Sequence, residues 1–395
     1  MERYDFVVIG GGVIGTSIAY HLARFGARSV LLLERGQLGA GTTAQSSCLV
    51  RTHYSVPQNV ALAKAGRDVL ADFARYLDDP DADSGFHRCG MMIVAPPGER
   101  STALCDSLAV ARAAGVDARE IARDDAARLH PLLHLDDIAA IGWEPDSGYA
   151  DAYLTLTAFA RNARRLGATI REGVAVTDLL RDPAGRVIGV RSALGDVAAA
   201  TVISAQNIWT GELARWTGAT LPLTLSRHAV FTLEGPAPYR RDLPVVKDLA
   251  SAGKLYFRSY GGAQVLVGDG NEGETIAAPD VEQADVALDY VIDIGAQLAH
   301  RVPAFESAGL AASWTGVYDV TPDWNPVLGP IAGVPGLLIA YGFSGHGFKL
   351  APIVGRLIAQ SALGLATDQP LAPYALARFA AGRLLTGRYG AGAVS

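Results

Sequence analysis

The strongest constraint on the fold is a glycine cluster near the N-terminus, GGGVIG at residues 10–15, which fits the pattern G-x-G-x-x-G. The cluster follows a short apolar segment, Asp5–Ile9, which is typical of a strand buried on both faces. Apolar residues at helical spacing come next, and a second apolar segment, Ser29–Leu33, ends on Glu34. That acid lies at the spacing of about 20 residues that the motif requires. This order predicts a βαβ unit that binds a dinucleotide.

Each glycine of the cluster has a physical role in such a unit. Gly10 allows the tight turn, Gly12 lets the backbone approach a pyrophosphate, and Gly15 lets the helix lie close to the strand. The helix N-terminus then presents free N–H groups and a positive dipole end to the phosphates. Glu34 can accept hydrogen bonds from ribose hydroxyls, and its charge would repel a 2′-phosphate. The fingerprint therefore indicates FAD or NAD, and not NADP.

The composition excludes several classes of protein. The 395 residues exceed the usual ~100–200 residues of one domain, so we expect two domains. Half of the residues are hydrophobic and 19% are charged, which excludes a disordered chain. The formal net charge of −6 argues against a nucleic-acid-binding protein, which would carry an excess of basic residues. The three cysteines, Cys48, Cys89 and Cys105, are odd in number and widely spaced, which argues against a disulfide framework and a zinc site.

The hydropathy pattern gives no reason to place the chain in a membrane. No segment has the ~18 consecutive apolar residues that a membrane span needs. The apolar run at residues 6–20 has no basic segment before it and contains four glycines, so it does not read as a signal peptide. We expect a soluble, cytoplasmic protein with no membrane or nucleic-acid partner.

Strong α/β signals lie at both ends and in the middle of the chain. Helical patterns are predicted at residues 60–77, 153–166 and 280–300. Strands are predicted at 174–180, 186–191, 197–204, 254–258, 263–268 and 336–340. The last strand is followed by a helix with an apolar stripe from Leu350 to Ile358. A nucleotide domain assembled from separated segments would explain this distribution.

Three further motifs carry a family resemblance. A loop of small residues at 39–50 is followed by Arg51, and the segment 146–151 reads DSGYAD. Near the C-terminus, WTGVYDVTPD at 314–323 is followed by NPVLG and then by GFSGHGFK at 342–349. With these motifs the chain resembles the D-amino acid oxidase superfamily of flavoproteins, nearest the sarcosine oxidase and glycine oxidase branch. The resemblance implies that the dinucleotide is FAD.

The resemblance also implies an architecture. It is an α/β fold in which a Rossmann-type FAD-binding domain is assembled from discontinuous segments. A second, α+β substrate domain is built on an antiparallel sheet. By chain order the FAD-binding domain takes residues 1–85, 146–219 and 321–385. The substrate domain takes residues 86–145 and 220–320, and residues 386–395 form a C-terminal tail.

Positions that match the family's motifs are expected to bind FAD. In the family the backbone at the position of Val176 meets the adenine, and relatives have a glycine at the position of Asn207. The asparagine side chain there is expected to shift the adenine or ribose pocket. The predicted cofactor-binding residues are Gly10, Gly12, Val13, Ile14, Gly15, Glu34, Arg35, Thr42, Thr43, Gln45, Ser46, Ser47, Val176, Ala205, Trp209, Gly316, Gly342, Ser344, Gly345, His346, Gly347 and Lys349.

The predicted catalytic residues are Arg51, Tyr318, His346 and Lys349. Arginine offers a planar fork that matches a carboxylate, and in relatives an Arg and a Lys at these positions hold the substrate acid. A surface salt bridge for Arg51 and core packing for Tyr318 are the ordinary alternatives. No metal site is predicted, because His130 and His134 are separated by a proline and no acid joins them.

Two positions bear on how FAD is attached. Some sarcosine oxidases attach FAD through a Cys where this chain has Gly316, and others through a His where it has Gln45, so non-covalent FAD is expected. Some oxidases of this branch carry a Lys that promotes reaction with oxygen, and the strand expected to hold it, Gln264–Gly268, has none. The electron acceptor, oxygen or another carrier, stays open at this stage.

These observations predict an FAD-dependent oxidation of a small amine or amino acid, a secondary amine such as an N-methyl or cyclic amino acid. Hydride would pass to flavin N5 and leave an imine. The alternatives are an NAD-dependent dehydrogenase with the same fingerprint, and a non-catalytic flavin-binding subunit of a larger complex. A monomer, a homo-oligomer and a subunit of a hetero-oligomer are all compatible with the sequence.

Overall fold

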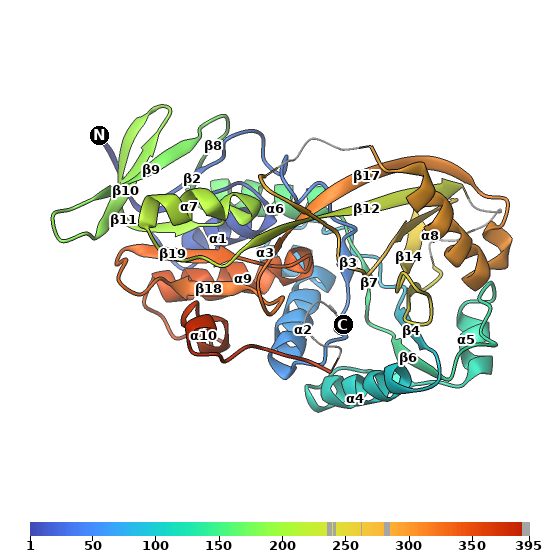
Figure 1. The fold of residues 1–395 in the computed structure, drawn as a ribbon. Helices are drawn as coiled ribbons and strands as arrows, with labels where there is room; N and C mark the ends of the chain where they lie inside the picture. Colours follow the sequence, from blue (N-terminus) through green and yellow to red (C-terminus); the bar gives the residue numbers. More distant parts are fainter. Residues whose placement is uncertain (235–238, 240–241, 262, 280–284, 389–395) are drawn as a thin grey trace.

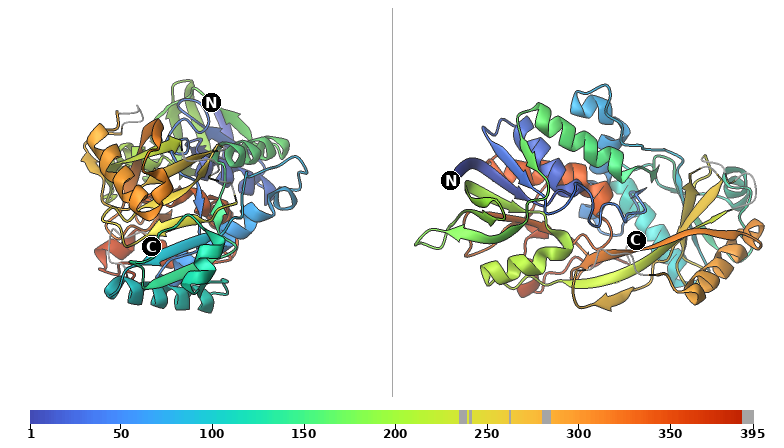
Figure 2. Two further views of the ribbon diagram at one scale, coloured as in Figure 1. Left: turned by 90° about the vertical axis from the view of Figure 1, so that its right-hand side faces the viewer. Right: turned by 90° about the horizontal axis from the view of Figure 1, so that it is seen from above.

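Two β-sheets lie side by side in the computed structural model of the protein (Figure 1). The structure describes residues 1–395 except 235–238, 240–241, 262, 280–284 and 389–395. Within the described residues one sheet has eight strands and the other has nine. A view from above shows the same two halves, each with helices packed on its sheet (Figure 2). The predicted α/β fold with a second, sheet-based half is confirmed.

The first sheet has the strand order β18-β19-β11-β1-β2-β8, and its four central pairings, from β19 to β8, are parallel. Strands β9 and β10 extend it by antiparallel pairing next to β11. The strand bounds are Glu2–Ile9 (β1), Val30–Leu33 (β2), Thr169–Arg171 (β8), Val176–Arg181 (β9), Val187–Ser192 (β10), Gly195–Ser204 (β11), Val327–Pro330 (β18) and Leu337–Tyr341 (β19). Three separated stretches of chain therefore contribute to one sheet.

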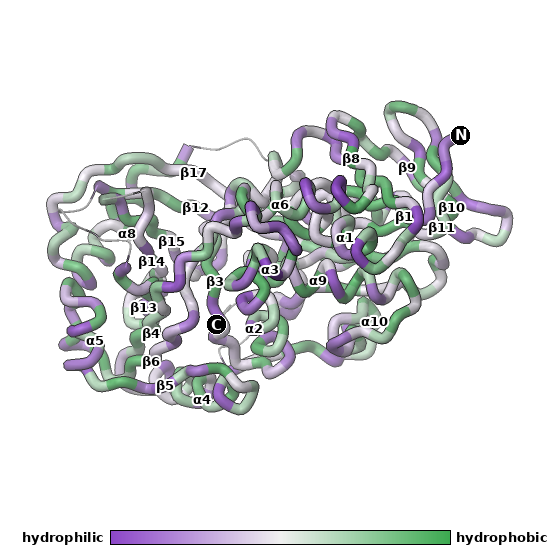
Figure 3. Tube along the Cα trace, turned by 180° about the vertical axis from the view of Figure 1, so that it is seen from behind, coloured by the Kyte–Doolittle hydropathy of each residue, from purple (hydrophilic) through white to green (hydrophobic). Residues whose placement is uncertain are grey.

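Helices cover both faces of this sheet because its central strands are apolar on both sides. On β1, Phe6 and Val8 belong to the core shared with helices α1, α6 and α9. Val7 and Ile9 point the other way and join the core that contains helix α7. These helices are Val13–Arg24 (α1), Ala152–Arg165 (α6), Thr210–Thr217 (α7) and Gly347–Ala362 (α9). The hydropathy of the chain trace shows this apolar interior and its polar connecting loops (Figure 3).

The second sheet has the strand order β16-β12-β15-β14-β13-β4-β6-β5, with β17 paired to β12. All of its pairings are antiparallel except that between β4 and β13. The strand bounds are Met91–Ala95 (β4), Arg119–Glu120 (β5), Ala140–Glu144 (β6), Thr224–Glu234 (β12), Val245–Asp248 (β13), Tyr256–Tyr260 (β14), Gln264–Gly268 (β15), Glu274–Ile276 (β16) and Gly309–Val320 (β17). The long pair β12 and β17 reaches back to the first half of the molecule (Figure 2).

Two helices bury the faces of the second sheet. Met91 and Ile93 of β4 pack into the core that includes helix α4 (Glu99–Ala113), whereas Met92 and Val94 face helix α8 (Leu288–Arg301). This alternation follows from the two-residue repeat of a strand. The remaining elements are β3 (Leu49–Val50), which pairs with β7 (Gly148–Tyr149), and the helices α2 (Pro57–Ala71), α3 (Phe73–Leu77), α5 (Arg123–Leu129) and α10 (Ala377–Ala380).

Several expected elements differ from the structure at their ends. The helix expected at 60–77 is two helices, because the backbone leaves the helical conformation at Asp72 (φ −125°, ψ 45°). The helix expected at 280–300 begins at Leu288, and residues 280–284 lie outside the described residues. The same holds for residues 389–395 of the expected tail. The domain boundaries given above stay a prediction.

Candidate active site

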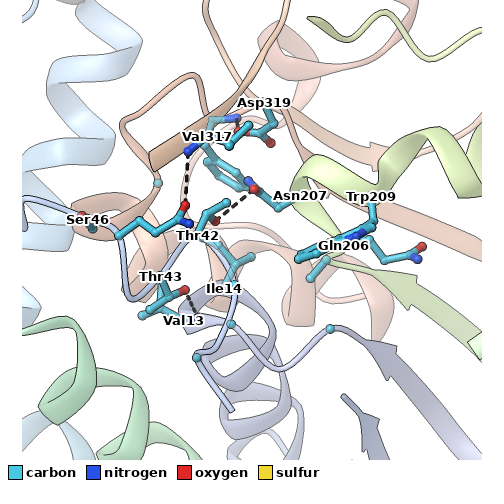
Figure 4. Close-up of a pocket in the computed structure, with 18 of the residues that line it drawn as sticks. Val13, Ile14, Thr42, Thr43, Ser46, Gln206, Asn207, Trp209, Val317 and Asp319 are labelled. Carbon is cyan, nitrogen blue, oxygen red and sulfur yellow. Dashed lines mark hydrogen bonds between the residues drawn. The ribbon is translucent and has the colours of Figure 1, made fainter. Parts of the chain in front are cut away.

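A first cavity begins at the glycine turn and ends at strand β17 and the start of helix α9 (Figure 4). Residues from both sheets line it, so it connects the two halves of the molecule. Most of the predicted cofactor-binding residues line this cavity. They are Gly10, Gly12, Val13, Ile14, Glu34, Arg35, Thr42, Thr43, Gln45, Ser46, Ser47, Val176, Ala205, Trp209, Gly316, Gly345 and Gly347.

The three glycines of the fingerprint have different surroundings. Gly10 has a φ of +106°, and a Cβ at Gly10 or Gly15 would collide with a backbone carbonyl. Gly12 faces the cavity, and a Cβ there would have Thr43 Oγ1 at 3.1 Å as its one neighbour within 4 Å. Gly15 lines neither this cavity nor the second one described below. Two glycines thus serve the turn and the helix packing, and Gly12 leaves room for a ligand at the backbone.

Glu34 is fixed at the polar end of the cavity by backbone donors. The N–H of Gly11 donates to Glu34 Oε2 at 2.6 Å, and the N–H of Gly36 donates to Glu34 Oε1 at 2.8 Å. Each carboxylate oxygen keeps a further lone pair for a hydroxyl group. Nearby, the Arg35 guanidinium lies 4.9 Å from the centre of the Trp209 ring, which gives this end of the cavity a flat, cationic wall.

Asn207 adopts a left-handed backbone conformation, with a φ of +51°. Glycine and asparagine tolerate this conformation better than other residues, so the backbone here is compatible with asparagine and with the glycine that the family resemblance implies. The Asn207 Oδ1 accepts a hydrogen bond of 3.0 Å from Thr42 Oγ1, so the side chain ties the cavity's two walls together (Figure 4). Whether this tie shifts the adenine or ribose pocket stays a prediction.

The two positions considered for covalent attachment lie together. A Cβ built on Gly316 would be 3.2 Å from Gln45 Cβ, and the Val317 N–H donates to Gln45 Oε1 at 3.1 Å. The loop after Glu34 is therefore pinned to strand β17 at this point. Two residues along β17, the Tyr318 ring stacks on His228 with their centroids 4.0 Å apart.

Asp319 is a functional candidate that the sequence reasoning missed. Its carboxylate accepts hydrogen bonds from the N–H of Gly342 at 2.5 Å and of Phe343 at 3.1 Å. Burial raises the pKa of Asp319 to about 6, against the effect of these two donors. Asp319 also lines the first cavity, whereas Gly342 lines neither cavity. The contact holds the loop 342–346 against β17, and only the tertiary structure reveals it.

A second cavity adjoins the first one. The two share a wall that consists of Ser46, Ser47, His228, Tyr256, Tyr318, Gly345 and Phe348. All four predicted catalytic residues, Arg51, Tyr318, His346 and Lys349, line the second cavity, and so does Ser344. The structure thus brings together residues that are up to 298 positions apart in the chain.

Positive groups gather around the Tyr54 ring at this second cavity. The Arg51 guanidinium lies 4.5 Å and the Lys349 Nζ 5.7 Å from the ring centroid. The Tyr54 hydroxyl is 3.1 Å from His346 Nδ1. Burial and the Arg51 charge hold the pKa of Lys349 well below its usual range. Burial and the charges of Lys349 and Arg51 also hold the pKa of His346 well below its usual range. An anion in this cavity would stabilise the charged form of Lys349.

Strained backbone also marks the two cavities. Apart from glycine, the described residues with positive φ are Cys48, Asp78, Asn207, Lys254, Trp324 and Ser344. Asn207 lines the first cavity, and Lys254, Trp324 and Ser344 line the second. Such conformations cost on the order of 1–3 kcal/mol each and gather at functional sites. Further lining residues that the sequence did not single out for this site include Gln206, Val230, Tyr256, His228 and Lys247.

Away from the cavities, His134, Asp137 and His300 place possible ligand atoms within 4.8 Å of one another. The sequence predicted no metal site at His130 and His134, and the fold groups His134 with Asp137 and His300 instead. The Asp137 carboxylate is already held by the Arg301 guanidinium, at 2.7 and 2.8 Å. Because a fixed guanidinium repels a cation, we assign no metal to this group.

The first cavity fits an extended FAD. Its glycine turn provides space at the backbone of Gly12, where a pyrophosphate would approach. The Glu34 carboxylate stands at the ribose end, and the Tyr318 ring stands at the far end, beside the second cavity. When FAD is bound, its ring system would therefore face the cavity that holds Arg51 and Lys349.

The sequence profile of the DAO family, described as FAD dependent oxidoreductase, matches residues 5–361. The chain therefore belongs to this family of flavoproteins and has FAD as its cofactor. The predicted resemblance is confirmed, and FAD, not NAD, is the dinucleotide. Within the residues that the structure describes, no helix is long and apolar enough to cross a membrane.

Three relatives illustrate the family. A 4-methylaminobutanoate oxidase (formaldehyde-forming) of Paenarthrobacter nicotinovorans is 32% identical over 90% of this chain, which spans 43% of that protein. A glycine oxidase of Geobacillus kaustophilus is 27% identical over 95% of this chain and 97% of that protein. The crystal structure of an L-proline dehydrogenase from P. horikoshii superposes with a TM-score of 0.89 and 26% identity, over 97% of this chain and 99% of that one. The chain thus spans less than half of the first of these relatives.

Proposed function

We propose that the protein oxidises a small amino acid at a C–N bond, and that the substrate is a secondary amine such as an N-methyl or cyclic amino acid. The observation that carries this proposal is the junction of the two cavities. A pair of cations, Arg51 and Lys349, lines the second cavity, next to the wall where the first cavity ends. The names of the three relatives, which include a methylamino acid, glycine and proline, agree with this class.

When bound, FAD would accept the hydride, with its two electrons, that leaves the carbon next to nitrogen. The protein's own contribution is to position the substrate. Arg51 and Lys349 hold the carboxylate, and the Arg51 fork fixes its orientation. The Tyr318 ring, stacked on His228, forms part of the wall that the two cavities share.

The same cations favour the reactive protonation state of the substrate. A positive surrounding lowers the pKa of a bound ammonium group, because it destabilises the charged form. The amine would then bind neutral, and no protein base is needed to remove its proton. Burial also lowers the pKa of His228 to about 4, so its ring stays neutral at physiological pH.

Anaerobic mixing tests this proposal. The FAD-loaded protein is mixed with N-methyl and cyclic amino acids, and the loss of the visible flavin absorbance is followed. We expect bleaching by at least one of them. If no small amino acid or amine bleaches the flavin, the protein is instead a non-catalytic flavin-binding subunit.

The carboxylate clamp is tested by Arg51→Ala with the best substrate of that screen and with the matching simple amine. Loss of a charge-assisted fork should lower kcat/KM for the acid by about thirty- to a thousandfold, and much less for the amine. Arg88→Ala, at an exposed arginine, is the control. An equal loss on both substrates would remove the clamp from the proposal.

A further inference from the structure

The lysines of this chain have an unusual distribution. The chain has 30 arginines and four lysines, Lys64, Lys247, Lys254 and Lys349. The last three of these line the second cavity. Lys64, on helix α2, pairs with Asp68 at 2.8 Å, whereas the three cavity lysines form no ion pair among the described residues. The charge of Asp269 acts on Lys247 and Lys254, but without a direct ion pair each of these lysines keeps N–H donors for an anion.

Lys247 is held in place by a neutral partner. Its Nζ donates a 2.7 Å hydrogen bond to the backbone carbonyl of Lys254 and lies 5.7 Å from the centre of the Tyr256 ring. Lys254 has a φ of +47°, so the carbonyl that orients Lys247 belongs to a strained residue. The amine of Lys247 therefore has a fixed position and keeps donors for another group.

Lys247 is a second positive position, distinct from the clamp. Arg51 and Lys349 lie on the Tyr54 ring, whereas Lys247 comes from strand β13 and lies on the Tyr256 ring. Both groups line the same cavity. One carboxylate of a substrate can occupy the clamp and leave Lys247 for a second anionic group.

The charge balance of the cavity agrees with a dianionic ligand. Its acidic lining residues are Glu99 and Asp269. Its basic lining residues are Arg51, Arg100, Lys247, Lys254, Lys349 and Arg388. Asp269 accepts a hydrogen bond from the N–H of Asn271 at 3.4 Å, and burial raises its pKa, whereas the charges of Lys247 and Lys254 act against that shift. Arg388 already pairs with Asp106, and burial lowers the pKa values of Lys247 and Lys349, so an anion beside each lysine would be needed to hold it in the charged form.

We propose that Lys247 forms a subsite for a second carboxylate, and that the substrate is a dicarboxylic amino acid. This inference rests on the proposed function, since it takes the clamp at Arg51 and Lys349 as the site of the first carboxylate. The pocket then selects substrates by two anionic groups, one at the clamp and one at Lys247.

Binding of two unreactive acids tests the subsite. Succinate and butyrate have four carbons each and differ in one carboxylate. Their dissociation constants are measured on the FAD-loaded protein from the perturbation of the flavin spectrum and by titration calorimetry. We expect succinate to bind at least about tenfold more tightly than butyrate, the effect of one charge-assisted hydrogen bond.

Two variants test whether Lys247 causes the preference for succinate over butyrate. Lys247→Met should remove most of it and change butyrate binding less than about threefold. Gly270→Ala keeps the charge but places a Cβ against Lys247 Nζ, and it should weaken succinate binding selectively as well. Lys64→Met is the matched control on the surface and should leave both constants unchanged.

The outcomes separate the subsite from the proposed function. Equal binding of the two acids by the parent, or an equal loss of both in Lys247→Met, overturns the subsite. Flavin bleaching by a monocarboxylic amino acid would then still support the proposed function. If neither acid binds and no amino acid bleaches the flavin, the clamp itself is wrong and both proposals fail.

Discussion

At the scale of single residues, Glu34 gives a direct test of the cofactor site. One of its carboxylate oxygens accepts the N–H of Gly11 in the glycine turn, and the other accepts the N–H of Gly36. In Glu34→Gln one oxygen becomes an amide nitrogen, so a backbone donor and a ribose hydroxyl lose their charged acceptor. The loss of a charge-assisted hydrogen bond, roughly 1.5–3 kcal/mol, should weaken FAD binding about tenfold or more.

The measurement is the dissociation constant of FAD, from quenching of flavin fluorescence on binding to apoprotein. Glu274→Gln, at an exposed glutamate of the other sheet, is the control. Unchanged FAD affinity in Glu34→Gln would show that the ribose contact is misassigned.

A second residue-scale prediction concerns the attachment of FAD. Gly316 and Gln45 lie next to each other at the cavity and offer no nucleophile. We therefore expect acid precipitation to release FAD into a yellow supernatant and leave a colourless pellet. A yellow pellet would contradict this expectation, and Cys48, in the same loop region, would then be the first residue to examine.

How far the sequence predicts single residues depends on how local their role is. Gly12 and Glu34 belong to one short motif, whose spacing alone indicates their roles. Arg51 and Lys349 were predicted from the family's motifs, and no observation yet tests their roles with a substrate. Asp319 and Lys247 could not be assigned in this way, because their partners come from chain segments that only the fold brings near.

At the scale of elements, the contact between strand β17 and the loop before helix α9 should stabilise both. Asp319 accepts two buried backbone N–H groups from this loop. In Asp319→Asn one oxygen becomes an amide donor, which leaves a buried N–H without an acceptor and costs about 1–3 kcal/mol. We expect a lower Tm and weaker FAD binding, because the same loop leads to Gly345 at the cavity wall.

Thermal unfolding followed by circular dichroism, with and without added FAD, checks this prediction. Asp178→Asn, at a half-buried aspartate of strand β9, provides the comparison. A melting temperature equal to that of the parent would mean that the loop holds its position without Asp319.

Element boundaries were harder to predict than the elements themselves. The apolar pattern at 60–77 continues through Asp72, where the structure breaks the helix. The periodicity of apolar residues does not show where a helix ends, because packing in the folded molecule determines that position. Asn207 shows the same limit for a turn. The positive φ at this residue is compatible with asparagine. The sequence alone could not show whether the asparagine simply fits the turn or also shifts the adenine or ribose pocket.

At the scale of the whole molecule, the two sheets meet where both cavities meet, and the cations of the second cavity are enclosed between them. Burying charged groups in this way lowers the stability of the folded protein, and the substrate site requires this burial. Burial, together with Arg51, lowers the pKa of Lys247 to about 7, from a usual value of 10.5. Asp269 and Asp248 act against this shift, and Lys254 adds to it.

This pKa shift fixes the sign of a stability change. Between pH 7 and about 10.5 the unfolded chain carries the Lys247 proton and the folded chain does not, so the stability from this group rises with pH. Below pH 7 the amine is charged in both states, and the burial penalty is fully present. Lys247→Met removes the group, so it should raise Tm by roughly 2 °C or more at pH 6, and the gain should shrink towards pH 10. Parallel melts of parent, Lys247→Met and Lys64→Met across this range check it, and a gain that grows with pH would show that Lys247 is stabilising as a cation.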